Sequence, residues 1–117
     1  MTETDFRNTI REYSDIVESV EIFQLSEEEK VSQLKAKLRL TDASILWIRE
    51  IRIREIPEAY SYYWLNPDEI VIMGWDNAPH HKNISSFPHH RHIGNDIEAS
   101  DERNLRDVLK FIRILTG

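Results

Sequence analysis

The chain has 117 residues, with 21 acidic and 15 basic side chains, no cysteine and a formal net charge of −6 at pH 7. This length suits one small domain with a single core, and a hydrophobic content of 40% with only three glycines excludes a disordered or collagen-like chain. The acidic balance argues against a generic nucleic-acid coat protein, and the absence of cysteine excludes disulfides, thiolate nucleophiles and cysteine-ligated zinc.

The charge is unevenly distributed along the chain. Residues 1–30 carry nine acids and three bases, whereas residues 31–54 carry six bases and two acids. This asymmetry permits a local basic face on an acidic protein. No apolar run approaches the roughly 18 residues that a membrane span needs, and the first residues lack the basic and apolar regions of a signal peptide. We therefore expect a cytoplasmic protein without membrane contact.

The first predicted element is an amphipathic helix over residues 5–19, for which Thr4 or Asp5 can supply the N-cap. Residues 22–25 either extend this helix or form a short strand, and residues 26–30 are predicted to be a charged loop. The helix prediction rests on apolar residues at three- and four-residue steps, namely Phe6, Ile10, Tyr13, Ile16, Val17 and Val20.

A β-hairpin is predicted next, because apolar and polar residues alternate from Val31. If the turn sets Leu40 opposite Ile45, then Lys35 lies opposite Glu50, and three further bases share that face: Lys37, Arg39 and Arg52. The hairpin would then present a mainly basic surface. Its strands and turn are predicted at residues 31–40, 45–53 and 41–44.

Pro57 is expected to end the second strand, and a second hairpin is predicted from strands 60–65 and 70–75. Asn66-Pro67-Asp68 supplies the turn residues. Pairing Leu65 with Ile70 gathers one face of large side chains: Tyr60, Tyr62, Trp64, Val71, Met73 and Trp75. Such a stripe is more often core than ligand platform, although stacking on nucleic-acid bases stays an alternative.

Residues 76–92, DNAPHHKNISSFPHHRH, hold all five histidines and are predicted to be a shaped loop. Imidazole can act as base, acid or metal ligand near neutral pH. A polar loop that is merely His-rich, or an incidental metal-binding tract, is the alternative. Neighbouring residues in an extended segment point to opposite sides, so one of His80 and His81 is expected at a shared site together with His90 and His92. Asp76 is expected to orient one ring through its Nδ1.

A C-terminal helix is predicted over residues 100–116, with Ser100 as N-cap and Gly117 just past its end. Its apolar stripe comprises Leu105, Val108, Leu109 and Ile112. The predicted fold is α+β, with a four-stranded antiparallel β-meander at residues 31–75 packed with an N-terminal and a C-terminal helix. We expect one domain over residues 1–117.

Two chemistries suit the histidine segment. In metal-independent RNA cleavage, one histidine takes the proton of a ribose 2′-OH, another protonates the leaving 5′ oxygen, and Arg91 or Lys82 stabilises the phosphorane; positioned acid and base contribute about 10² to 10⁴ in rate. The candidate catalytic residues are His80, His81, His90, His92 and Asp76. The candidate substrate-binding residues are Arg91, Lys82, Asn77, Lys37, Arg39 and Arg52.

The second chemistry is binding of Zn²⁺ or another divalent metal by three histidines, with or without Asp76, and with an open position for water. The alternative metal set is His81, His90 and His92. No HExxH or similar ordered motif is present, so spacing alone does not favour metal strongly.

Three segments of the sequence resemble the TumE family of toxins from toxin-antitoxin systems: DNAPHH at 76–81, FPHHRH at 87–92 and IEASDERNLRDVLKFI at 97–112. The strand regions at 34–51 and 60–65 are also similar to that family. The resemblance covers about residues 30–115, and the acidic N-terminal third matches the family least. The positions that match the family's motifs are Asp76, Asn77, Pro79, His80, His81, Pro88, His89, His90 and His92.

The resemblance implies a small cytoplasmic prokaryotic toxin encoded beside a helix-turn-helix antitoxin. Cleavage of mRNA is inferred from the toxin role and from a general likeness to RelE-type ribonucleases, which is an analogy of fold. RNA is then the expected substrate, a homodimer stays open, and the alternative is a metal-binding partner of the antitoxin without RNA cleavage. Gly74-Trp75 departs from the more basic residue expected before Asp76 and weakens any phosphate contact there.

Overall fold

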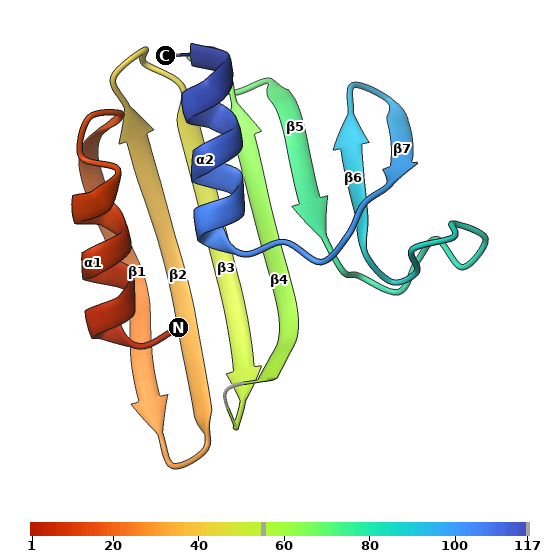
Figure 1. Cartoon of the computed structure of the whole chain (residues 1–117), viewed down its shortest axis with the longest axis horizontal. Coiled ribbons are helices and arrows are strands. Elements are labelled where there is room, and N and C mark those ends of the chain that lie inside the picture. The colour runs from red at the N-terminus through yellow and green to blue at the C-terminus, as the bar shows by residue number, and fades with distance from the viewer. Residues whose placement is uncertain (55, 117) are drawn as a thin grey trace.

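The computed structural model describes residues 1–54 and 56–116, which form one antiparallel sheet and two helices (Figure 1). The seven strands of the described chain lie in the sheet in their sequence order, so each strand pairs with its neighbour along the chain. The elements are α1 (Glu3–Glu12), β1 (Val17–Glu28), β2 (Val31–Leu40), β3 (Ile45–Ile53), β4 (Ile56–Leu65), β5 (Val71–Asp76), β6 (His90–Ile93), β7 (Asp96–Ala99) and α2 (Leu105–Thr116).

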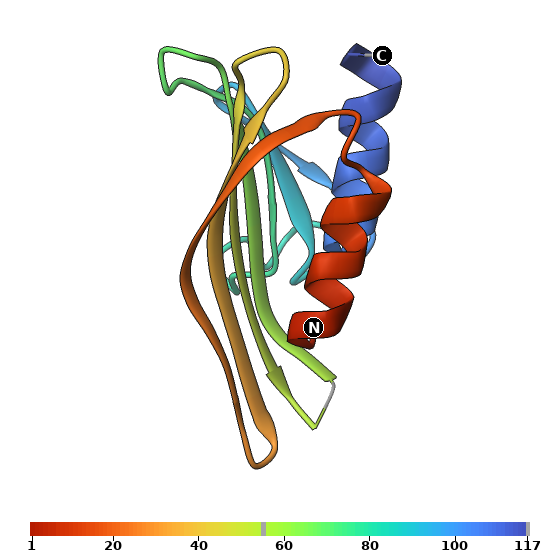
Figure 2. The ribbon, with the colours of Figure 1, turned by 90° about the vertical axis from the view of Figure 1, so that its left-hand side faces the viewer.

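Both helices pack on the same face of the sheet, and the other face carries no helix (Figure 2). The core lies between the helices and strands β2 to β5. Its most buried side chains include Phe6, Leu34, Leu38, Leu40, Leu46, Ile48, Tyr62, Leu105, Leu109 and Ile112. We call the two surfaces of the sheet the helix face and the open face.

The predicted α+β class and antiparallel meander are confirmed. The predicted number of four strands is wrong, because β1, β6 and β7 extend the sheet. The N-terminal helix ends at Glu12, and residues 17–28 form β1. Two register shifts in β1 place Val17 and Val20, and then Ile22 and Leu25, on the helix face. The three-residue steps from Val17 to Val20 and from Ile22 to Leu25 imitate a helical repeat, which explains the error.

Residues 26–30 are also not a loop, since Ser26, Glu27 and Glu28 continue β1 and leave a tight turn at Glu29 and Lys30. Glu29 has a φ of 52°, the left-handed conformation that such turns use.

The predicted bounds of β2 and β3 are correct, but the predicted register is wrong by one residue. Arg39, and not Leu40, pairs with Ile45, because Leu40 N donates to Ser44 O at 2.9 Å and closes the loop one residue earlier than predicted. A shift of one residue moves every side chain to the other face. Lys35 therefore lies opposite Arg49, not Glu50. Lys37 and Arg39 lie on the open face, whereas Arg52 lies on the helix face.

Pro57 does not end a strand; β3 ends at Ile53, and Pro57 lies inside β4 opposite Arg52, next to a register shift. The aromatic stripe is core, as predicted: Tyr60, Tyr62, Trp64 and Trp75 are each 5% exposed or less. Leu65 pairs with Val71 and not with Ile70, because the register shifts after the Trp64–Met73 pair. Val71 is consequently exposed.

The segment 76–92 is not a loop throughout, since Asp76 ends β5 and residues 90–93 form β6. The C-terminal helix begins at Leu105, not at residue 100. Asn104 is its cap: Asn104 Oδ1 accepts from Asp107 N at 2.9 Å, and Asp107 Oδ2 accepts from Asn104 N at 3.0 Å. Ser100 Oγ instead donates to the carbonyl of Asp101. Gly117, predicted just past the helix, lies outside the described residues.

Candidate active site

Pairing of β5 with β6 brings one carboxylate and two imidazoles together on the open face. Asp76 lies opposite His90, and Gly74 lies opposite His92. His90 Nε2 is 2.9 Å from Asp76 Oδ1, and His92 Nε2 is 3.2 Å from Asp76 Oδ2. The two Nε2 atoms are 3.1 Å apart. The alternation argument for His90 and His92 therefore predicted their shared side correctly.

The contacts of His90 determine where its ring hydrogens lie. His90 Nδ1 is 2.9 Å from the carbonyl oxygen of Pro88, which can only accept, so Nδ1 carries a hydrogen. In a neutral ring Nε2 would then present a lone pair to the Asp76 carboxylate. The 2.9 Å contact between Nε2 and Asp76 Oδ1 is therefore bridged by a proton on one of the two groups or by a metal cation. The expected contact of Asp76 with a histidine Nδ1 is wrong, because both rings face Asp76 with Nε2.

Tyr63 holds the same carboxylate from β4, and sequence reasoning missed this residue. Its hydroxyl donates to Asp76 Oδ2 at 2.6 Å, and its ring lies 5.9 Å from that of His92. Burial, and next the hydrogen bond to Asp76, raise the pKa of Tyr63 well above its usual value, so the phenol stays a neutral donor.

Gly74 creates the space that Tyr63 occupies. The two residues are cross-strand partners, and a Cβ on Gly74 would lie only 2.4 Å from Tyr63 Cε1. A glycine inside a strand commonly marks such a close approach, and this was the signal in the sequence. The Gly74-Trp75 departure from the expected basic residue thus has a structural role here, because Trp75 packs on Phe111 of α2.

The segment 77–89 returns His81 to the cluster. The His81 ring centroid lies 4.9 Å from that of His90 and 6.0 Å from that of His92. One ring nitrogen from each of these three histidines lies within 4.8 Å of the others. Three imidazoles with Asp76 beside them are a donor set that suits Zn²⁺ with an open fourth position. The residues therefore fit a divalent metal as well as a proton.

The other two histidines lie elsewhere. His89 lies against β4, where its Nδ1 is 2.9 Å from the Tyr60 hydroxyl and its ring stacks on Tyr60. His80 is exposed in the connecting segment. Of the four candidate catalytic histidines, the structure brings together His81, His90 and His92 but leaves His80 apart.

The side chains of the cluster differ in solvent exposure, and therefore in whether they can contact a ligand. The side chains of His90 and Asp76 are 3% and 9% exposed, whereas that of His92 is 25% exposed. His81 and Tyr63 are half-buried. His92, His81 and Tyr63 can therefore contact a ligand. Asp76 and His90 are more deeply buried and hold these side chains in position.

The candidate substrate-binding residues divide between the two faces. Arg91 lies on the helix face and pairs with Glu98 at 2.7 Å, away from the histidines. Arg52 pairs with Glu50 on that same face. Asn77 accepts from Tyr60 N and donates to the carbonyl of Glu58, so it fixes the end of β5. Of the remaining candidates, Lys37 and Arg39 lie on the open face, and Lys82 is exposed in the segment between β5 and β6.

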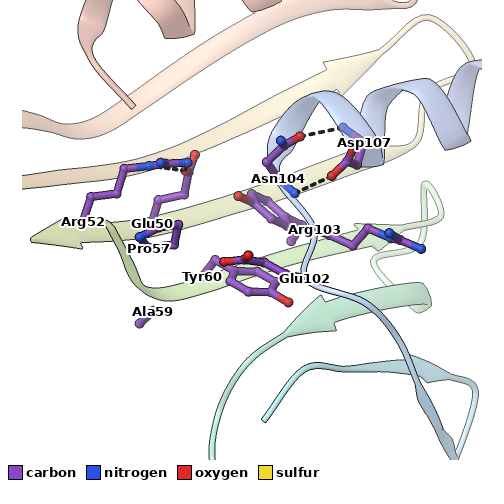
Figure 3. A pocket seen from close by; sticks show the side chains of 10 residues that line it. Glu50, Arg52, Pro57, Ala59, Tyr60, Glu102, Arg103, Asn104 and Asp107 are labelled. Atoms are coloured by element: carbon purple, nitrogen blue, oxygen red, sulfur yellow. Dashed lines mark hydrogen bonds and ion pairs between the residues drawn. The ribbon is translucent and has the colours of Figure 1, made fainter. Parts of the chain in front are cut away.

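A cavity on the helix face is separate from this cluster (Figure 3). It lies between β3, β4 and the start of α2, and its lining includes Glu50, Arg52, Tyr60, Arg103 and Asp107. Glu50 is 3% exposed, and its Oε2 has no hydrogen-bond partner among the described residues. The sheet lies between this cavity and the clustered histidines.

These features define a small α+β domain with a carboxylate–imidazole cluster on the open face of an antiparallel sheet. The family model described as Toxin TumE matches residues 6–116. The chain belongs to the TumE toxin family, and the match also includes the N-terminal third that resembled it least. No curated protein and no solved structure matches the chain.

Membership of this family implies a toxin and suggests an antitoxin as its partner. None of the helices in the described chain is both long and apolar enough to cross a membrane.

Proposed function

We propose that the protein is the toxin of a type II toxin-antitoxin system and that it cleaves RNA at the cluster of His81, His92 and Tyr63. The convergence of Asp76, His90, His92 and Tyr63 within hydrogen-bond distance carries this proposal. A buried carboxylate that fixes imidazoles beside a solvent-facing surface is what acid–base catalysis requires. The toxin acts in the cytoplasm and is held inactive by a helix-turn-helix antitoxin.

The reaction proceeds without metal and is balanced in protons. Of His81 and His92, one accepts the proton of the ribose 2′-OH, and the oxygen attacks the adjacent phosphorus. The bond from phosphorus to the 5′ oxygen breaks, and the other histidine gives its proton to that oxygen. The products end in a 2′,3′-cyclic phosphate and a 5′-hydroxyl. Lys82 is exposed in the segment 77–89, and its positive charge can offset the negative charge on the phosphorane.

The test is cleavage of end-labelled RNA by purified, untagged protein in the presence of EDTA. We expect fragments with cyclic phosphate ends, and a loss of about 10² or more in rate for His92→Ala and His81→Ala. His80→Ala is the matched control, since it removes an exposed histidine of the same segment. Growth arrest in cells without any new RNA ends would reject RNA cleavage.

A second candidate function is metal-dependent binding of the antitoxin without RNA cleavage. The close approach of His81, His90 and His92 favours it. Metal analysis of the untagged protein tests it: one Zn²⁺ or Mn²⁺ per chain, lost in His90→Ala and His92→Ala, would support a metal site. A metal-free protein that cleaves RNA in EDTA would reject it.

A further inference from the structure

The open face carries a row of basic and aromatic side chains that leads from β2 to the histidine cluster. Lys37 lies opposite Trp47, Trp47 lies opposite Tyr63, and Tyr63 lies over Gly74 beside His92. Cross-strand partners in an antiparallel sheet share a face and lie close together. The row therefore ends at the candidate active site.

A second row runs parallel to the first. Lys35 lies opposite Arg49, Arg49 lies opposite Ser61, and Ser61 lies opposite Asp76, which pairs with His90. Four strand spacings separate β2 from β6 in each row, which is about 19 Å. This length corresponds to a few nucleotides of an extended strand.

Trp47 differs from the other two tryptophans in its exposure. Trp64 and Trp75 are 5% and 2% exposed in the core, whereas Trp47 is only half-buried and lies on the open face. Phe23 of β1 stacks on Trp47 with ring centroids 5.6 Å apart, and Lys37 Nζ lies 5.2 Å from the centroid of the Trp47 ring. These contacts hold the indole as a rigid platform beside a cation.

The charge of this face is opposite to that of the whole protein. Lys35, Lys37, Arg39 and Arg49 lie on it although the net charge is −6. Among the described residues, none of these four forms an ion pair with an acidic side chain. Glu21, opposite Lys37, is the acid of β1 nearest to them in register.

We propose that the open face of β2 to β4 binds single-stranded RNA and guides it into the histidine cluster, an inference that rests on the proposed ribonuclease function. Bases stack on Trp47 and Tyr63, and phosphates contact Lys35, Lys37 and Arg49. Aromatic platforms beside cations are the recognition mode of unpaired strands, because bases in a duplex are stacked on each other. The charge pattern and the continuity with the cluster favour RNA over a protein partner.

The test measures binding separately from cleavage, with a fluorescent oligonucleotide whose ribose 2′-oxygens are methylated and which cannot be cut. We expect Trp47→Ala to weaken binding about five- to a hundredfold, and Trp47→Phe to retain most of it. Binding should also quench tryptophan fluorescence in the wild type. Circular dichroism and thermal unfolding check that each variant is folded.

The charge contribution is tested by the double variant Lys35→Ala/Arg49→Ala. We expect it to reduce the slope of log affinity against log salt concentration by about 0.7 for each phosphate that the variant no longer neutralises. Lys110→Ala removes one charge at an exposed position of α2, on the helix face, and is the control for charges outside the open face. It should leave both affinity and slope unchanged.

Three outcomes would overturn the RNA-binding face: equal loss of affinity in Lys110→Ala, equal affinity for duplex and single strand, or a dimer in sedimentation that Trp47→Ala dissociates. The last outcome would show that a second copy covers this face. If the wild type binds the oligonucleotide through Trp47 but cuts no RNA, the ribonuclease proposal fails and the binding face stands.

Discussion

The Asp76 carboxylate is the residue on which the candidate site depends. It accepts from the Tyr63 hydroxyl at 2.6 Å and from its own loop at Ala78 N at 2.9 Å, and it contacts both His90 and His92. Each oxygen therefore has two partners. A buried carboxylate with this many contacts is fixed in one orientation, and it fixes the two rings in turn.

Removing the hydroxyl of Tyr63 should weaken the site and the fold together. We expect Tyr63→Phe to lower the free energy of unfolding by about 1 to 3 kcal/mol, because Asp76 is buried and loses a donor, and to slow RNA cleavage. Urea unfolding and the cleavage assay measure these effects. Tyr60→Phe is the control, because it removes a hydroxyl that contacts His89 outside the cluster. Equal loss of activity in the two variants would contradict the separation of His89 from the site.

Adding a methyl group to Gly74 should displace Tyr63. The new Cβ would meet the ring at 2.4 Å, so we expect Gly74→Ala to destabilise the fold by about 1 to 3 kcal/mol. In a Tyr63→Ala background the ring is absent, and the same change should cost much less. A double-mutant cycle from urea unfolding measures this coupling. Additive effects would show that the ring and Gly74 do not interact.

At the scale of the elements, α2 depends on its cap at Asn104. We expect Asn104→Ala to lower the free energy of unfolding by about 1 kcal/mol, because the amide of Asp107 loses its acceptor. Ser100→Ala should change it by less, since Ser100 lies outside the helix. Thermal unfolding of the two variants compares them, and a larger effect at Ser100 would place the start of the helix where the sequence predicted it.

The strands differ in how much of them the sequence reveals. β2 and β3 were predicted to the residue because β2 alternates from Leu34 to Leu40 and β3 is a short run rich in apolar, β-branched residues after a turn. β1 was not, because its register shifts give Val17 and Val20 a helical spacing. β6 and β7 have four residues each, and β7 is exposed throughout, so neither leaves an apolar pattern.

The candidate site was also predictable only where a regular pattern in the sequence determines it. The shared side of His90 and His92 could be predicted, since alternation is a property of any extended segment. The participation of Tyr63 could not, because it depends on the β4–β5 register. Pairing Leu65 with Ile70 would set Tyr63 opposite Ile72, two residues away from its actual partner Gly74. A basic face was predicted, but some of its residues were predicted wrongly. Arg49 belongs to it and Arg52 does not, because Leu40 faces Ser44 and the β2–β3 register shifts by one residue.

At the scale of the whole molecule, alkaline pH should destabilise the fold. Burial raises the pKa of Tyr60 to about 12, and it also raises the pKa values of Tyr62 and Tyr63. A group with a raised folded-state pKa contributes its stability fully below the unfolded value of 10.0, and that stability is lost as pH rises through the folded values. We therefore expect the free energy of unfolding to fall between about pH 10 and 12.

Urea unfolding across this range, with phenolate absorbance as a second signal, measures the effect. Tyr63→Phe should reduce the slope by about one proton per chain, since one titrating group is removed. A stability that stays constant from about pH 9 to 11.5 would contradict the burial of these phenols.

The sequential strand order also determines how firmly the active geometry is held. Residues 77–89 form the longest connection in the described sheet, and β6 and β7 lie to the side of α2 (Figure 1). Local unfolding is favoured where few apolar side chains are buried, and β7 buries none. We expect amide hydrogen exchange to be faster in β6 and β7 than in β3. We then expect a local opening equilibrium in which His90 and His92 part from Asp76 while β2 to β4 stay folded.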